Sequence, residues 1–518
     1  MLMKKLVAFY ASVSLLFNLN LCAQSEELVE QFMKEATENS QLEILGQELL
    51  DEIGPRLVGT PQMKKAHDWA VKKYTEWGIP ARNEAYGTWR GWERGITHID
   101  MLTPRVQSLK GTQLAWSPST PEKGITAEVV ILPMVENAAA FTKWLSSING
   151  KIVMISRLEN TGRPDYNWEE YATTESFERM KATREADIKA WRENLRNTGY
   201  SSRSIIKALE DAGAAAIISS YWSKGFGVNK IFSARTKNIP TVDLELEDYG
   251  LVYRLVKRGK KPTLSIKAIS KELGEVPTFN TIAEIRGTEK PDEYVVLSAH
   301  FDSWDGGTGA TDNGTGTLVM LEAMRILKKI YPNPKRTIMV GHWGGEEQGL
   351  NGSRAFVEDR PEIVKNIQAV FNQDNGTGRV VNISGQGFLH AYDYLGRWLQ
   401  IVPEEITQYI KTTFPGTPSR GGSDYASFLA AGVPAFSLSS LSWSYSNYTW
   451  HTNRDTYDKV VFDEVRNNVI LTVILAYMAA EDSTTTSREK RVLPINKRSG
   501  RPMKWPTQRS PNRKGGMQ

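Results

Sequence analysis

The 518-residue chain has the composition of an ordinary globular protein, 40% apolar and 24% charged, and its length allows roughly two or three domains. Its net charge of +5 comes from the C-terminal end, where residues 488–514 hold ten Lys and Arg against the single acid Glu489. The rest of the mature chain is net negative, which excludes a nucleic-acid binder with a basic face.

The N-terminus has the pattern of a secretory signal over residues 1–23. Lys4 and Lys5 precede an apolar run from 6 to 21, and a mature start near Gln24 is predicted. A lipid anchor on Cys22 and an uncleaved membrane helix are the alternatives, but the residue before Cys22 is large for an anchor site and the run is short for a bilayer. We therefore expect an exported protein, periplasmic or extracellular. Cys22 is the only cysteine, so the mature chain would have no disulfide and no thiolate chemistry.

Residues 24–95 are predicted to form the first segment of the main domain, with a helical pattern to about Tyr86. Thr60-Pro61 is typical of a helix start, with Thr60 as the N-cap and Pro61 at the first helical position. His67 lies on this helix beside Asp68, and we expect a surface or packing histidine there.

In residues 96–273 the helical pattern gives way to short strand-like runs, and this region is predicted to be an inserted domain. Short strand-like runs occur at 127–132, 152–155, 215–219, 241–246 and 263–268. Glu247-Asp248, at the end of one run, has no histidine nearby and is expected to cap the next helix. Residues 168–194 are rich in charge and aromatics, which is consistent with an amphipathic helix or with a lid or dimer contact.

From 274 to 483 strand and helix signals alternate, as in βαβ units, and predict the second segment of the main domain. Strands are expected at 281–285, 294–299, 336–342, 367–373 and 435–438. Helices are expected at 317–330, 352–359, 395–401, 424–431 and 462–481. The basic tail, 484–518, is predicted to be disordered, or alternatively to attach to an anionic cell surface.

The stretch 298–316, SAHFDSWDGGTGATDNGTG, follows a buried strand and precedes a helix. It places His300 and Asp302 at the carboxyl end of that strand and Asp312 in a glycine-rich loop. Open α/β sheets bind ligands at this edge. A histidine and carboxylates gathered there predict a metal site with nitrogen and oxygen ligands.

Four further clusters fall at strand or loop ends: GGEEQG at 344–349, FNQD at 371–374, SDY at 423–425 and WHTNRDT at 450–456. Each alone is a weak signal, because paired acids are usually solvated and strand-terminal acids often cap helices. Together at one sheet edge they offer a two-metal site. The candidate ligands are His300, Asp312, Glu347, Asp374 and His451. This set suits Zn²⁺, with Co²⁺ or Mn²⁺ as alternatives, and leaves Glu346 to face a water molecule.

The motifs HFDS…GATDNGTG, GGEEQGLNGS, NQD, SDYASF and HTNRDT resemble metallopeptidase family twenty-eight. The resemblance covers residues 53–78, including IGPRLVGTP, and 279–481. Residues 96–273 are similar to the protease-associated insert of the branch that contains plasma glutamate carboxypeptidase. The implied fold is a three-layer α/β/α sandwich with a mixed, largely parallel sheet, plus a smaller inserted α+β or β domain.

The resemblance also implies roles for the site residues. Two zinc ions would be held by His300 and Asp374 on one side, by Glu347 and His451 on the other, and by Asp312 between them. Glu346 would be the general base that takes a proton from a shared water. Asp302 would accept the other ring N–H of His300. Where the family often has Ser-Asp-His, this chain has Tyr425, which would either donate to the oxyanion or pack.

The resemblance implies a di-zinc exopeptidase, an aminopeptidase or dipeptidase. Carboxypeptidase-type specificity on the same site is an alternative, and Arg420 and Arg454 are candidates for a carboxylate contact. An inactive receptor or scaffold of the same fold is a second class, and cyclisation of N-terminal glutamine is a third. The expected partner is a peptide, with neither nucleic acid nor a membrane span in the mature chain, and a homodimer is a candidate assembly.

Overall fold

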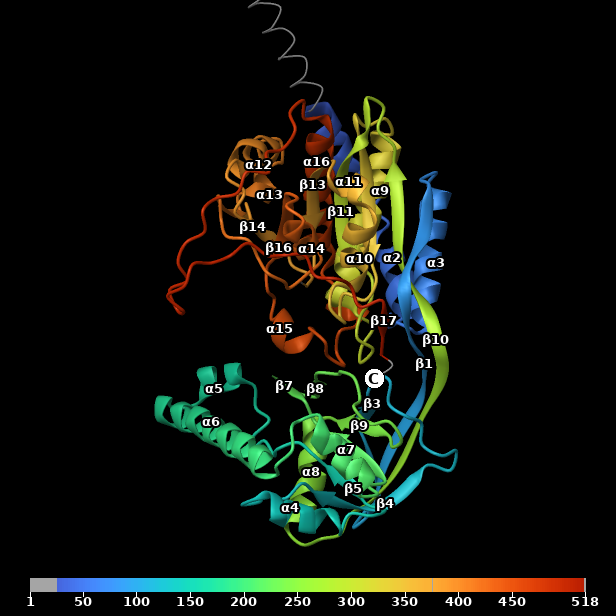
Figure 1. The fold of residues 1–518 in the computed structure, drawn as a ribbon, viewed down its shortest axis with the longest axis vertical. Coiled ribbons are helices and arrows are strands. Elements are labelled where there is room, and N and C mark those ends of the chain that lie inside the picture. Colours follow the sequence, from blue (N-terminus) through green and yellow to red (C-terminus); the bar gives the residue numbers. More distant parts are fainter. Residues whose placement is uncertain (1–25, 375, 517–518) are drawn as a thin grey trace, which may run out of the picture.

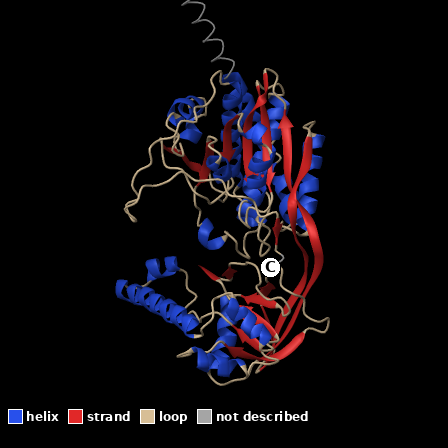
Figure 2. Ribbon diagram, viewed as in Figure 1, coloured by secondary structure: helices blue, strands red, loops and turns tan. Residues whose placement is uncertain are grey.

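A computed structural model describes residues 26–374 and 376–516 of the chain. The predicted signal peptide and Cys22 lie outside the described residues. Two bodies lie one above the other, joined by a ribbon of two long strands, β1 (Ala81–Thr103) and β10 (Thr263–Ile285) (Figures 1 and 2). These strands pair antiparallel from Ala81↔Ala283 to Thr103↔Thr263. The boundaries expected at 95/96 and 273/274 therefore fall inside continuous strands that belong to both bodies.

The first segment of the main domain departs from expectation at its end. Thr60 caps α3 (Pro61–Glu76) as predicted, because its side chain accepts from the N–H of Met63 at 3.2 Å. The chain then enters β1 at Ala81, so the helical reading to Tyr86 is wrong. His67 is fully buried rather than at the surface, with ring atom Nδ1 2.7 Å from the hydroxyl of Thr281.

The main-domain sheet runs in the order β15-β14-β16-β13-β11-β12-β10. β11 pairs parallel with β12 and β13, and β13 with β16, while β10 and β14 are antiparallel to their neighbours β12 and β16. The sheet is thus mixed and largely parallel, which confirms the expected α/β class. The other strands are β11 (Lys290–His300), β12 (Arg336–Trp343), β13 (Ile367–Asn372), β14 (Val380–Ser384), β15 (Lys411–Thr413) and β16 (Ala435–Ser440).

Helices cover both faces of this sheet. Successive residues of a strand point to opposite faces, and on β12 His342 lies 2.7 Å from the hydroxyl of Tyr74 in α3, whereas Trp343 packs on Phe356 of α10 and Phe428 of α14. The main-domain helices comprise residues 26–38, α2 (Leu42–Gln47), η1 (Glu48–Ile53), α3, η2 (Ala310–Gly314), α9 (Thr315–Ile330), α10 (Asn351–Asp359), α11 (Pro361–Val364), α12 (Ala391–Leu399), α13 (Glu404–Thr407), α14 (Tyr425–Ala430), α15 (Tyr445–Tyr448), η3 (Tyr457–Lys459) and α16 (Phe462–Glu481).

The inserted domain is itself an α/β layer, where the sequence favoured an α+β or β arrangement. Its parallel strands are β4 (Ile125–Ile131), β5 (Ile152–Met154), β6 (Ala216–Ser219) and β9 (Thr241–Leu244). One face packs on α8 (Leu246–Lys257) and the other on α4 (Ala138–Leu145) and α7 (Ser204–Asp211). The remaining elements are β2 (Gln107–Leu109), β3 (Gly111–Gln113), α5 (Asp165–Tyr171), α6 (Thr174–Asn197) and the hairpin β7 (Trp222–Gly225) and β8 (Val228–Asn229).

The basic tail packs against the main domain along the described residues 484–516, so its predicted disorder is wrong. The Trp505 ring packs on Phe388, with ring centroids 5.6 Å apart. Arg513 pairs with Asp359 at 2.7 Å, and β17 (Lys514–Gly515) adds to β1. Composition alone predicted a solvated extension because it does not reveal these individual contacts.

Among the described residues, no helix combines the length and apolar character needed to cross a bilayer. α16 includes the apolar run that the sequence analysis assigned to the core, and its side chains are buried from Val469 to Tyr477.

Candidate metal centre

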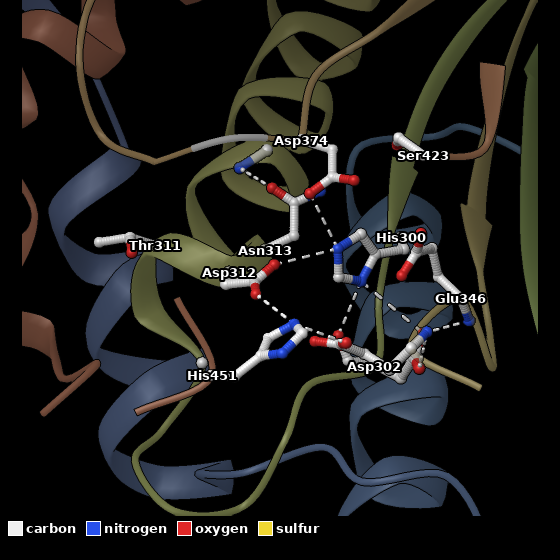
Figure 3. A network of polar contacts seen from close by, with 12 residues as sticks. His300, Asp302, Thr311, Asp312, Asn313, Glu346, Asp374, Ser423 and His451 are labelled. Carbon is white, nitrogen blue, oxygen red and sulfur yellow. Dashed lines mark hydrogen bonds and ion pairs between the residues drawn. The ribbon is translucent and has the colours of Figure 1, made fainter. Parts of the chain in front are cut away.

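The candidate ligands meet where β11, β12 and β13 end. His300 is the last residue of β11, Glu347 follows β12, and Asp374 follows β13. Figure 3 shows His300 in contact with both Asp312 and Asp374, and Asp312 in contact with His451 as well. The sheet edge therefore brings together side chains from distant parts of the sequence.

The first group of ligands is centred on His300. Its Nε2 atom lies 3.0 Å from Oδ1 of Asp374 and 3.3 Å from Oδ1 of Asp312. His300 is fully buried. Burial alone would lower its pKa, but the Asp374, Asp302 and Asp312 carboxylates outweigh this and raise the pKa of His300 well above its usual value.

The second group shares Asp312 with the first. Nε2 of His451 lies 3.2 Å from Oδ2 of Asp312 and 2.9 Å from Oε2 of Glu347. Burial, with the charge of Asp312 nearby, raises the pKa of Glu347 to about 7. In each group, one ligand atom from each residue lies within 4.8 Å of the others. One oxygen of Asp312 faces each histidine, which is the arrangement that a bridging carboxylate needs.

These residues fit a pair of zinc ions. Imidazole nitrogen and carboxylate oxygen are ligands that Zn²⁺ accepts. The buried Oε1 atom of Glu347 has no hydrogen-bond partner in the described part of the chain, and a buried carboxylate oxygen is costly to leave without one. Asp312, Glu347 and Asp374 also repel one another at these distances, which divalent cations between them would relieve.

The Asp302 carboxylate was expected to accept the ring N–H of His300, but it has other partners in the structure. Nδ1 of His300 lies 2.9 Å from the backbone carbonyl of Asp302, and 3.7 Å from its carboxylate. The backbone carbonyl therefore accepts the ring N–H and sets the tautomer. The carboxylate instead accepts from the backbone N–H groups of Glu346 and Glu347, at 3.0 and 3.2 Å. It thereby fixes the segment that carries the candidate base and one ligand.

Glu346 is the candidate base, and it stands beside the ligands as predicted. Its side chain is half-buried. Burial, together with the negative charges of Asp374, Asp424 and Glu347, raises the pKa of Glu346 well above its usual value. A carboxylate with a raised pKa holds a proton more readily, which a group that both accepts and returns a proton requires.

Two buried residues of the site were given no role from the sequence. Asp455 accepts from the N–H groups of Thr311 and Asp312, at 2.8 and 3.0 Å, and so positions the shared ligand. Arg56 is fully buried and donates to the carbonyls of Phe301, Thr308 and Gly309, each at 2.8 Å. Both stand inside motifs quoted above, IGPRLVGTP and HTNRDT, but only the fold shows their partners.

The SDY motif supplies a packing residue. The hydroxyl of Tyr425 points to the carbonyl of Gly421 at 3.4 Å, and the side chain is largely buried. The structure thus favours packing over an oxyanion contact. Arg420 donates to the carbonyl of Lys504 in the tail, and Arg454 pairs with Glu245 of the inserted domain at 2.7 Å. Both arginines already have protein partners.

A cavity of about 860 Å³ opens beside one candidate ligand, Glu347, between the two domains. Glu347 and Gln348 line its main-domain side. Its lining includes the aromatic residues Trp89, Trp116 and Trp304. The cations that line it are Arg90 and Lys207, which pair with Glu272 and Asp211, and Arg203, Arg235 and Lys237. Sites for small ligands usually have volumes of about 300–1,000 Å³, so a short peptide fits this cavity.

Two clusters of nitrogen and oxygen donors that share one carboxylate, with a glutamate beside them, define a two-metal hydrolase site. The sequence profile of peptidase family M28 matches residues 280–476, which include every candidate ligand. The chain is 28% identical to carboxypeptidase Q of Homo sapiens over 441 residues, covering 84% of each chain.

Two solved structures extend this comparison. A peptidase M28 precursor from Shewanella amazonensis is 25% identical, with a TM-score of 0.65, covering 92% of this chain and 100% of that one. A zinc aminopeptidase from Bacillus subtilis is 18% identical, with a TM-score of 0.53, covering 86% and 96%, and shares the fold. Residues 280–476 are thus a peptidase family M28 region. With the relatives above, this region makes the chain a zinc-peptidase-type hydrolase, a metallo-exopeptidase.

Proposed function

We propose that the chain is a di-zinc dipeptidase, an exopeptidase that hydrolyses dipeptides and other short peptides with a free C-terminus. The observation that carries this proposal is the pair of donor groups sharing Asp312, with Glu346 beside them. Glu347 of the second group also lines the cavity between the domains. His300 and Asp374 would hold one ion, and Glu347 and His451 the other.

Zinc bound here would polarise the scissile carbonyl and make water more acidic. The protein's own groups carry the rest of the reaction. Glu346 accepts a proton from the attacking water and delivers it to the leaving amine. Asp302 keeps Glu346 and Glu347 in place through their backbone N–H groups, and the cavity walls align the peptide.

The charges in the cavity support recognition of a substrate carboxylate. Arg203 and Lys237 have no ion-pair partner among residues 26–374 and 376–516, and Arg235 donates only to Ser202 there. Of the inserted-domain acids that line the cavity, Asp211 is already paired with Lys207 at 2.6 Å, and Glu210 accepts from the backbone N–H groups of Lys237 and Ile239. Free cations facing a peptide site favour pairing with a C-terminal carboxylate. The similarity to carboxypeptidase Q, which spans the inserted domain, supports the same specificity.

Substrates with one terminus blocked test this proposal. We expect zinc-dependent hydrolysis of free dipeptides, retention of activity when the amine is acetylated, and at least ~10-fold loss when the C-terminus is an amide, because one charged contact is lost. Arg235→Ala should raise KM for free dipeptides, with the distant Arg286→Ala as the control. Hydrolysis of aminoacyl-anilides with no preference for a free carboxylate would contradict the proposal and indicate an aminopeptidase.

We also propose that the protein is exported, on the basis of Lys4, Lys5 and the apolar run that follows them. Mass spectrometry of the protein from its native cells, separated into compartments, should find a mature N-terminus near Gln24 outside the cytoplasm. A lipid mass on Cys22 would establish the anchored form instead. An intact N-terminus in the cytoplasm would contradict export.

A further inference from the structure

A segment of the inserted domain is bonded to the loop that carries His451. Residues 227–232 include β8, and residues 445–454 include α15, which lies beside this hairpin in Figure 1. Lys230 and Thr452 form an antiparallel bridge. The N–H of Ile231 donates to the carbonyl of His451 at 2.8 Å. The backbone of one metal ligand is thus held directly by the other domain.

Side chains reinforce this junction on one side. The N–H of Asn229 donates to the Asn453 side chain at 2.9 Å, and the N–H of Asn453 donates back to the carbonyl of Asn229 at 3.0 Å. Arg454 donates to the carbonyl of Gly227 at 2.9 Å and pairs with Glu245 at 2.7 Å. These reciprocal bonds fix the register of the two segments.

Lys230 closes the junction on the other side. Its ammonium lies 3.8 Å from the centre of the Trp450 ring and donates to the carbonyls of Ser446 and Trp450 at 3.0 and 3.3 Å. The Trp450 ring stacks on His451 with centroids 4.0 Å apart, and Phe232 meets the same imidazole edge-on at 5.4 Å. Lys230 therefore acts on His451 through Trp450.

His451 needs such support because its backbone is unfavourable. Its φ of 58° lies in the left-handed region that non-glycine residues rarely adopt. Such a conformation persists only when surrounding contacts determine it. In the described part of the chain, His300 and Asp374 make no hydrogen bond, ion pair or ring contact with residues 227–232, and they are placed by the ends of β11 and β13.

We infer that residues 227–232 of the inserted domain, with Lys230 as the positioning residue, form a latch that holds His451 in its ligand position. The metal site of Asp312, Glu347 and His451 then depends on the inserted domain, and the site of His300, Asp312 and Asp374 does not. This inference rests on the proposed function only in that both groups bind zinc.

Zinc titration of metal-free protein tests the latch without any peptide. Wild type is expected to show two zinc sites. Lys230→Ala should weaken one of them by about 10- to 100-fold, as changes behind metal ligands typically do, and leave the other unchanged. Lys230→Arg, which keeps the cation, should restore most of the affinity. Lys224→Ala is the matched control, because Lys224 lies on the same hairpin and pairs with Asp165 instead.

Ligand variants identify which site has changed. In a His451→Ala background, Lys230→Ala should add no further loss, whereas in a His300→Ala background it should still weaken the remaining zinc. Asn453→Ala is a second latch variant with the same expected effect. Unchanged affinity at both sites, or equal weakening of both, would overturn the inference. Two bound zinc ions without peptide hydrolysis would contradict the proposed function and leave the latch standing.

Discussion

Asp302 fixes the candidate base and one ligand through their backbone N–H groups. Asp302→Asn keeps the size of the side chain but replaces one acceptor oxygen with a donor, so one of the two bonds is lost. We expect zinc affinity or kcat to fall by about 10- to 100-fold. Isothermal titration with zinc and steady-state kinetics provide the measurement.

Asp305→Asn is the matched control for this change. Asp305 is a buried acid in the same loop that pairs with Arg94 at 2.6 Å, so its loss should lower stability and leave zinc affinity unchanged. Wild-type zinc affinity and kcat in Asp302→Asn would show that the carboxylate does not position the segment.

At the scale of residues, the sequence singled out the candidate ligands that the fold brings together, but not the atoms that support them. His300, Glu347 and His451 stand in motifs whose order identifies the site. The role of Asp302 depends on whether its backbone carbonyl or its carboxylate faces His300. The turn after β11 decides this. Asp455 and Arg56 support the site through bonds to backbone groups, which no spacing in the sequence reveals.

The packing of α3 on β12 predicts a pH dependence of stability. Burial lowers the pKa of His342 to about 3, and burial with the charges of His342 and Lys64 lowers that of His67 to about 3. As the pH falls below about 6.5, both histidines become protonated in the unfolded chain but stay neutral in the folded chain. Each histidine therefore reduces the free energy of unfolding by ~1.4 kcal/mol per pH unit down to about pH 3.

His342→Gln isolates one of these contributions, because glutamine is uncharged and can still bond to Tyr74. Urea unfolding between pH 4 and 7 should show a slope that is ~1.4 kcal/mol per pH unit smaller than in wild type. His98→Gln, at an exposed position, should retain the wild-type slope. If the free energy of unfolding changes with pH by the same slope in His342→Gln and wild type, His342 does not cause this pH dependence.

The described tail contributes to stability through Trp505, which packs on Phe388 of the main core. Trp505→Ala should lower the free energy of unfolding by ~1–3 kcal/mol, the usual cost of losing a partly buried large side chain. Denaturant unfolding followed by circular dichroism measures this. Val492→Ala, at a 90% exposed position of the same tail, should change stability little. Equal stability of the Trp505→Ala variant and wild type would mean that the tail adds nothing.

Helices and strands with a clear pattern of apolar residues could be predicted from the sequence, and those without such a pattern could not. β11, β12 and β13 are buried apolar runs, and these strands appear where expected, as do α9 after β11 and α10 after β12. The strand β14, which follows β13, was not predicted. β1 was missed because most of its residues are half-exposed and polar, so that neither a strand nor a helix period stands out. Its partner β10 was seen only as two short runs for the same reason.

At the scale of the whole molecule, the β1–β10 ribbon places the inserted domain over the sheet edge that holds the metal ligands (Figure 1). The cavity therefore has one wall from each domain. The main domain supplies the candidate ligands and base, and the inserted domain supplies Arg203, Arg235 and Lys237, cations without an ion-pair partner in the described part of the chain. This division follows from the topology and could not be read from either segment alone.

We propose that Glu346 moves the proton in a two-zinc site that hydrolyses peptides. The most direct measurement is the zinc content and dipeptide turnover of wild type and Glu346→Gln, with Glu358→Gln at the surface as the control. We predict two zinc ions in all three proteins, and turnover lowered by about 10²- to 10⁴-fold in Glu346→Gln alone. Wild-type turnover in Glu346→Gln with both zinc ions bound would contradict the account.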